Sequence, residues 1–163
     1  REWLSPYVDD YSTLEPVDST WFRAESRGEY WEQARALIGR ESTLVFIDPD
    51  TGLQTGTPGY RRKAGPEKYL LNEELAGIYG AMAPRSAVMI YQHLQRNSHR
   101  HDDDTRKKID QVKRAMNCEH VHAYREADLA FILASNDADL STEIAEALTA
   151  YAGKRPSQSN AVY

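Results

Sequence analysis

The chain has 163 residues, of which 40% are hydrophobic and 28% are charged, and its formal net charge is −5. This length and composition suit one globular domain and exclude the fibrous and disordered classes. The negative charge argues against a general nucleic-acid coat and against a membrane-surface protein, which both present basic faces, although it does not exclude a local basic groove.

The sequence predicts an irregular segment and then a helix at the start of the chain. Residues 1–20 carry aromatic side chains among acidic residues and prolines, and we expect an irregular segment whose rings pack on a neighbouring surface. Because the sequence starts at Arg1 and not at Met, we also expect residues upstream of it. Ser26 and Glu29 have the spacing of a capping box, which predicts a helix over 27–38.

Two buried strands are predicted in the middle of the chain, joined by a long loop and a helix. Residues 43–48 and 87–91 are short apolar runs, which are typical of strands covered on both faces in a parallel sheet. Residues 49–67 are rich in glycine and proline, and a loop of this length inside a compact domain is usually functional or mobile. An apolar stripe predicts a helix over 72–82, which Pro84 ends.

The last third of the chain predicts a loop, a helix, a hairpin and a final helix. Residues 93–103 are rich in His and Asp and predict a polar loop, and apolar residues at helical spacing predict a helix over 104–116. Residues 120–124 and 129–134 are strand-like runs with only four residues between them, which indicates an antiparallel hairpin. The final helix is expected to begin at Ser141.

This order of elements predicts the fold class. Strands that alternate with helices imply a parallel sheet with helices on its faces. We therefore predict one α/β domain over residues 1–153, with a Rossmann-like, three-layer fold, a mostly parallel sheet and a C-terminal antiparallel hairpin. Residues 154–163 are expected to form a flexible tail.

Cysteine content and apolar runs narrow the class of protein further. Cys118 is the one cysteine, which excludes an internal disulfide and a Cys-rich zinc site. The apolar runs are far shorter than the roughly 20 residues that a membrane span requires. We therefore expect a cytoplasmic protein that has no membrane partner, and the oligomeric state stays open.

Reactive side chains follow both central strands at the point where each strand ends. Asp48 and Asp50 follow the first strand, whereas Gln92, His93 and Arg96 follow the second. Ligands of open α/β sheets bind beyond the carboxyl ends of the strands, so these groups would share one crevice if the two strands are neighbours.

Asp48 and Asp50 suit a metal site, because two carboxylates so close repel each other and a hard cation such as Mg²⁺ relieves this repulsion. Pro49 favours an extended conformation of Asp48, so that both carboxylates can point outward. A bound Mg²⁺ could polarise a phosphoryl oxygen or activate water. The competing interpretation is an ordinary turn, in which Asp side chains accept hydrogen bonds from their own backbone.

Basic residues near these strand ends suit a phosphate group. His93 could act as a general acid or base, or could be a histidine that hydrogen-bonds a loop carbonyl. Arg61 and Arg62 lie in the long loop, and Lys68 follows it. A basic loop over an acidic metal site could hold a phosphate backbone, and the alternative is a solvated flexible loop.

Two stretches of sequence resemble known groups of proteins. Phe46 to Leu53, together with the pairs at 68–69 and 74–75 and with Tyr91-Gln92-His93 and Arg96, resembles an uncharacterised group of bacterial and phage proteins, which implies no activity. The apolar strand that ends in Asp48-Pro49-Asp50 resembles the first motif of haloacid-dehalogenase-like phosphatases. That resemblance implies that Asp48 is a nucleophile and Asp50 an acid/base, with Mg²⁺ between them.

The run from the first strand to the hairpin resembles the C-terminal half of class I S-adenosylmethionine-dependent methyltransferases, without the half that holds the cofactor. In the amino-methylating kind, an Asp-Pro-Pro-Tyr-like motif at a strand end holds the target amine, and Asp48-Pro49-Asp50 stands at that place here. The resemblance implies a methyltransferase-like sheet and, for methyl transfer, S-adenosylmethionine as cofactor.

We therefore predict a Mg²⁺-dependent hydrolase that acts on a phosphoester, with nucleic acid as one candidate substrate. Asp48 and Asp50 would hold the metal and His93 would act as acid/base, while the residues expected to bind substrate are Lys68, Gln92, Arg96, Arg61 and Arg62. The alternatives are a methyltransferase-like protein, either active on an amine or a degenerate relic, and a non-catalytic binding module in which residues 48–52 are only a turn.

Overall fold

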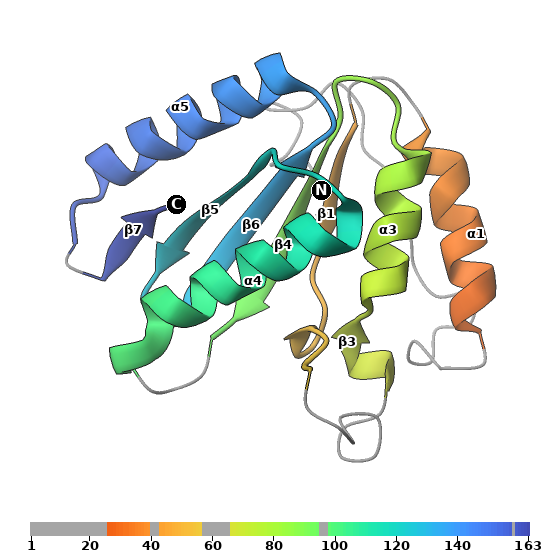
Figure 1. The fold of residues 1–163 in the computed structure, drawn as a ribbon, viewed down its shortest axis with the longest axis horizontal. Coiled ribbons are helices and arrows are strands. Elements are labelled where there is room, and N and C mark those ends of the chain that lie inside the picture. Colours follow the sequence, from red (N-terminus) through yellow and green to blue (C-terminus); the bar gives the residue numbers. More distant parts are fainter. Residues whose placement is uncertain (1–25, 40–42, 57–65, 95–97, 158) are drawn as a thin grey trace, which may run out of the picture.

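The chain folds into helices that pack on a five-stranded sheet (Figure 1). The structure is a computed structural model, and it describes residues 26–39, 43–56, 66–94, 98–157 and 159–163. The irregular segment predicted for residues 1–20 therefore lies outside the described residues. None of the described helices has both the length and the apolar character that crossing a bilayer requires.

The elements follow the predicted order for most of the chain. The helices are α1 (Arg27–Ile38), α3 (Asn72–Ala81), α4 (His101–Met116) and α5 (Ala138–Lys154), with short 3-10 turns at Pro66–Lys68 and Ser98–Arg100. The main sheet holds β1 (Leu44–Ile47), β4 (Ala87–His93), β5 (Val121–Glu126), β6 (Leu129–Ser135) and β7 (Asn160–Val162), while β2 (Gly52–Leu53) and β3 (Tyr69–Leu70) form a second, small sheet.

Two helices begin earlier than predicted. α4 begins at His101 and not at Asp104, so that three aspartates occupy its first turn, where negative charge stabilises the helix dipole. α5 begins before Ser141, because the Asp137 carboxylate accepts a hydrogen bond from the Leu140 N–H at 2.8 Å and thereby caps the helix.

The prediction of a mostly parallel sheet is wrong. The strand order is β1-β4-β6-β5-β7, and only the β1–β4 pair is parallel, whereas the other three pairs are antiparallel. The reason lies in the hairpin: its tight turn, in which Ala127 has a φ of 54°, returns β6 alongside β5, and β6 then inserts between β5 and β4. The fold is therefore α/β with a mostly antiparallel sheet.

α4 and α5 lie on opposite faces of the main sheet. Side chains alternate between faces along β5. Arg125 forms an ion pair with Asp102 of α4 at 2.9 Å, whereas the neighbouring Tyr124 ring makes an edge-to-face contact with Tyr151 of α5 at a centroid distance of 5.1 Å.

The main core lies between the sheet and the helices α3 and α4. Val88 and Ile90 of β4 and Ile132 of β6 have no exposed surface, and neither do Leu75 of α3 and Val112 of α4. Fully burying one such side chain contributes about 1.5–3 kcal/mol. This layer therefore covers the two central strands β4 and β6 on one face.

β7 lies in the segment that was expected to be a tail. The backbone of Tyr163, just beyond β7, exchanges two hydrogen bonds with Ala123 at 2.9 and 3.1 Å. The Tyr163 hydroxyl also donates to Asp102 and accepts from the Arg125 guanidinium at 3.2 Å. The hydrogen bond from Tyr163, followed by the charge of Arg125, holds the pKa of Asp102 below its usual value. Side chains and backbone thus both hold the last strand.

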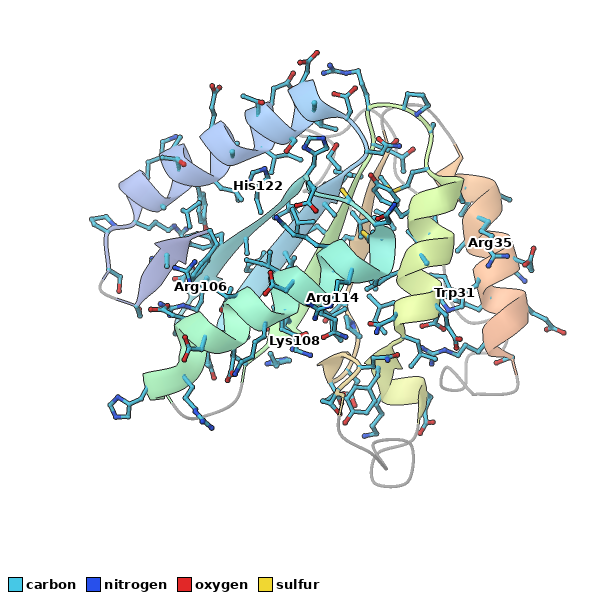
Figure 2. The ribbon with its side chains drawn as sticks, viewed as in Figure 1. Trp31, Arg35, Arg106, Lys108, Arg114 and His122 are labelled. Carbon is cyan, nitrogen blue, oxygen red and sulfur yellow. The ribbon has the colours of Figure 1, made fainter. Side chains whose placement is uncertain are left out.

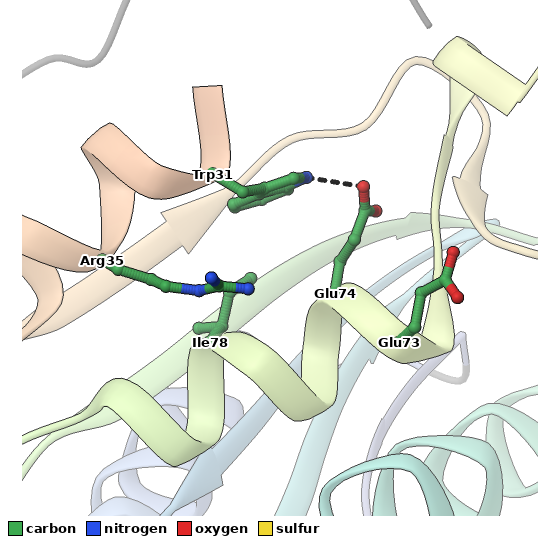
Figure 3. Close-up of a pocket in the computed structure, with 5 residues that line it drawn as sticks. All are labelled: Trp31, Arg35, Glu73, Glu74 and Ile78. Atoms are coloured by element: carbon green, nitrogen blue, oxygen red, sulfur yellow. Dashed lines mark hydrogen bonds between the residues drawn. The ribbon is translucent and has the colours of Figure 1, made fainter. Parts of the chain in front are cut away.

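Glu74 joins α1 to α3. Its carboxylate accepts a hydrogen bond from the Trp31 indole N–H at 2.5 Å (Figure 3). It also accepts hydrogen bonds from the Arg27 guanidinium at 2.6 Å and from the Leu71 N–H at 2.8 Å. The Arg27 and Glu74 side chains are only 11% and 8% exposed. A cavity of about 210 Å³ lies beside them, with Trp31 and Arg35 in its lining (Figure 3).

Replacing Glu74 by alanine should lower the free energy of unfolding by about 3 kcal/mol, because the buried Arg27 guanidinium then loses its partner carboxylate. Urea unfolding of the native chain and the variant measures this difference. The exposed neighbour Glu73 provides the control, since Glu73→Ala should stay within about 0.5 kcal/mol of the native chain. Equal losses in both variants would contradict the role given to Glu74.

His122 points from β5 toward α5 (Figure 2), and its Nε2 lies 2.8 Å from the Ser141 hydroxyl. Burial lowers the pKa of His122, and the charges of His120 and Lys113 lower it further. The imidazole therefore binds a proton less readily in the folded protein than in the unfolded chain, where its pKa is about 6.5.

The folded protein should consequently lose stability as the pH falls from about 7 to about 5, because the unfolded chain takes up the proton first. Above the pKa of the unfolded chain, the His122 imidazole is neutral in both the folded and the unfolded protein, so it contributes no pH dependence to the stability there. His122→Gln should flatten this part of the profile, whereas His93→Gln, at an exposed position, should retain it. Chemical unfolding at a series of pH values gives the profiles, and an unchanged slope in His122→Gln would refute the assignment.

Candidate functional site

The predicted site residues follow two strands that are neighbours in the sheet. β1 and β4 pair in parallel, from Leu44 opposite Ala87 to Ile47 opposite Ile90. Asp48 follows β1 directly, and His93 is the last residue of β4. The two strands therefore lie side by side, as expected. Their carboxyl ends meet at one edge of the sheet, namely the edge that strand ends form and not the open side of an outer strand.

His93 lies on the face of the sheet that points away from α4. Along β4, Tyr91 and His93 alternate with buried side chains, so they face away from α4. Phe46 of β1 shares that face, and Asp48 follows it by two residues. The parallel pairing thus brings residues 48 and 93 to neighbouring strand ends.

Aromatic rings adjoin His93 on this face. The Tyr91 ring meets the His93 ring edge-on at a centroid distance of 5.0 Å, and it meets the Phe131 ring of β6 at 5.5 Å. Phe46 of β1 is 56% exposed beside them. A flat ligand that approaches this edge would therefore meet aromatic faces as well as polar groups.

Gln92 points to the opposite face and anchors the loop that carries the aspartates. Its Oε1 accepts a hydrogen bond from the Leu53 N–H at 2.8 Å, and its Nε2 donates to the His93 carbonyl. Gly52 lies against the same carboxamide with a φ of 104°, and a Cβ at Gly52 would lie 2.4 Å from Nε2. The loop can therefore approach β4 this closely only with glycine at this position.

Lys68 is brought to Asp50 by the small parallel sheet of β2 and β3. The Thr51 N–H donates to the Lys68 carbonyl at 2.9 Å, just before the strands begin to pair. The Lys68 ammonium then lies 3.2 Å from an Asp50 carboxylate oxygen, with both side chains at least half exposed. Exposed ion pairs of this kind contribute about 0–1 kcal/mol, so a ligand can displace either partner at little cost.

Lys108 supports the same loop from α4 (Figure 2) and was not singled out from the sequence. Its ammonium donates to the Leu53 carbonyl at 3.1 Å, to the Gln54 carbonyl at 3.4 Å and to Gln111 Oε1 at 3.2 Å. Burial lowers the pKa of Lys108 to about 8, although the charge of Asp104 opposes this shift. The sequence feature that could have indicated Lys108 is its spacing, because it follows Asp104 by four residues and precedes Gln111 by three, which places the three side chains on one helix face.

Asp48 and Asp50 are both exposed, and Asp48 makes no hydrogen bond or ion pair within the described part of the chain. In the same part of the chain, no group of three or more His, Cys, Asp or Glu side chains is placed to hold a metal ion. Asp48 and Asp50 thus stand as a pair of exposed carboxylates that is smaller than such a group.

Three of the predicted substrate-binding residues cannot be placed at this edge. Arg61, Arg62 and Arg96 lie outside the described residues. Of the others, Lys68 lies at Asp50, and both polar atoms of the Gln92 side chain bond to the chain itself. Of the predicted site residues, the structure therefore places Asp48, Asp50, Lys68 and His93 at or next to these strand ends.

Comparisons with protein-family models, with curated proteins and with solved structures gave no match to this chain. The function is therefore argued from the geometry of the described residues.

Gly52→Ala should destabilise the protein by about 2 kcal/mol or more, because it combines a strained positive φ with a clash against Gln92. In a Gln92→Ala background the clash disappears and only the backbone strain remains, so the same substitution should cost less. Gly56→Ala is the control, since a Cβ at Gly56 meets nothing within 4 Å. Unfolding in urea gives the free energies of the native chain, the two single variants and the double variant. If the effects of Gly52→Ala and Gln92→Ala simply add, the contact between Gly52 and Gln92 is excluded.

Proposed function

We propose that this protein hydrolyses a phosphoester at the edge of the sheet where β1 and β4 end. The observation that supports the proposal is the parallel pairing of these strands, since it delivers Asp48, Asp50 and His93 to one edge. Lys68 adds a positive charge 3.2 Å from Asp50. Carboxylates, an imidazole and an ammonium group are the side chains that phosphoryl chemistry uses.

In this proposal Asp48 and Asp50 hold Mg²⁺, which polarises a phosphoryl oxygen when it is bound. His93 gives or takes the proton, because it is exposed at the strand end and imidazole is the side chain that most often acts as general acid or base. Lys68 is released from its weak ion pair and binds a phosphate oxygen. Gln92 and Lys108 act indirectly, since they hold the loop that carries the two aspartates.

The alternative of a simple turn has less support. A turn-forming aspartate accepts hydrogen bonds from its own backbone. Within the described part of the chain, the Asp48 carboxylate accepts none, and the Asp50 carboxylate pairs with the Lys68 ammonium. Backbone pairing with β3 and the Gln92 carboxamide hold the loop instead. Both carboxylates are therefore available to a ligand.

A second candidate function, methyl transfer to an amine, is supported by a different observation. Phe46 and Tyr91 lie on one face of the sheet near the end of β1, which Asp48 follows, and Phe131 lies next to Tyr91. Such rings can stack on a flat base whose amino group donates to the Asp48 carboxylate. Calorimetric titration with S-adenosylmethionine separates the two candidates, because the hydrolase has no reason to bind it.

Millimolar Mn²⁺ or Mg²⁺ should raise the melting temperature of the native chain, because a ligand that binds only the folded state stabilises it by about 2.7 kcal/mol at a hundredfold excess over its dissociation constant. Asp48→Asn should melt no lower than the native chain without metal and should lose this response. Asp110→Asn, an exposed aspartate on α4, is the matched control and should retain it.

Hydrolysis of bis(p-nitrophenyl) phosphate with Mn²⁺ then tests the reaction itself. Asp48→Asn and His93→Ala should each reduce the rate by about a hundredfold or more, while Asp110→Asn leaves it unchanged. A melting temperature that ignores the metal would rule out the metal-dependent hydrolase, and a metal response without turnover would leave a binding module.

A further inference from the structure

β1 forms one edge of the main sheet, and no described strand pairs with its outer side. The Thr43 carbonyl accepts the Ala87 N–H at 3.0 Å, so the backbone groups of residue 43 face β4. In a parallel pair this direction alternates from residue to residue, and Val45 therefore also bonds to β4. The N–H and C=O groups of Leu44 and Phe46 consequently point outward, away from the sheet.

The side chains of these two residues also lack cover. Leu44 and Phe46 are 54% and 56% exposed on the face of the sheet that carries α5, and α5 packs mainly on β5, β6 and β7. Natural edge strands usually prevent pairing through a lysine, a proline, a bulge or an inward-pointing charge. The strand Leu44–Ile47 has none of these devices. β1 thus combines an open hydrogen-bonding edge with an apolar surface.

We propose that β1 is the dimer interface of this protein, with two copies pairing β1 antiparallel about a two-fold axis at Val45. Leu44 and Phe46 are symmetric about Val45, so each lies opposite the other in the second copy. Their outward N–H and C=O groups then supply both the donors and the acceptors of the new ladder. This self-complementarity is what an isologous interface requires, and it joins the two sheets into one.

A groove beside β1 supports a second copy as the occupant. It has a volume of about 290 Å³ and lies between β1 and α5, with Leu44, Ala87, Leu133, Leu140 and Ile144 among its lining residues. In the proposed register Phe46 of the second copy lies opposite Leu44 on this face. The phenyl ring is thereby placed at a groove whose lining is apolar except for Thr43 and Arg85, and it would bury surface that is exposed in a single copy.

Sedimentation equilibrium of the full chain over a range of concentrations tests the proposal. The native chain should dimerise, and Phe46→Pro should raise the dissociation constant at least about tenfold, because it removes an outward N–H from each copy and no bond to β4. Val162→Pro is the matched control. Tyr163 turns its backbone to Ala123, so the Val162 N–H points outward at the other edge of the sheet, and this variant should dimerise like the native chain.

Amide hydrogen exchange of the native chain keeps the proposal testable if Phe46→Pro does not fold. The amides of Leu44 and Phe46 should exchange slowly at high protein concentration and rapidly after dilution, whereas Val45 and Ile47 stay protected by β4 at every concentration. A chain that stays monomeric, a dimer in which the Leu44 and Phe46 amides exchange freely, or a dimer that Phe46→Pro leaves intact would overturn the proposal.

Discussion

The contact between the Gln92 carboxamide and the loop at Gly52 determines where the candidate site can form. Gln92 is buried at the end of β4, and its Oε1 holds the Leu53 N–H at 2.8 Å. Buried polar groups are costly without partners, so this bond fixes the loop on the strand. Asp48 and Asp50 lie in the few residues between β1 and this anchor, and Lys68 reaches Asp50 because β3 pairs with the strand that contains Gly52.

Much of the fold could be predicted from local sequence patterns. The apolar runs of β1 and β4, the helical stripes and the short gap between β5 and β6 all correspond to observed elements. The strand order could not be predicted in the same way. A hairpin fixes that β5 and β6 pair with each other, but only packing against β4 decides that β6 and not β5 becomes its neighbour. Residues 160–162 likewise become a strand through their partners in β5, because their own pattern is too short to predict one.

The candidate site shows the same division between local and distant information. The apolar runs indicated that β1 and β4 are strands, and these strands do pair. The expectation that both are covered on both faces is wrong for β1, because β1 is an edge strand whose Leu44 and Phe46 are more than half exposed. The supporting contacts were not inferable. Glu74 accepts hydrogen bonds from Arg27 and Trp31, more than 40 positions away, and Lys108 donates to a loop 55 positions away. No periodicity within either helix distinguishes such side chains from solvated ones, since the partner lies on another element.

The insertion of β6 has a consequence for the order in which the chain can fold. β4 pairs on its inner side with β6, which joins Ala87 to Ser135 and follows β4 by a helix and another strand. During synthesis, β1, α3 and β4 leave the ribosome well before the strand that completes them. Until β6 is synthesised, the inner side of β4 has no partner strand, and open strand edges promote aggregation. The central pair of the sheet can therefore form only after α4 and the hairpin have been synthesised.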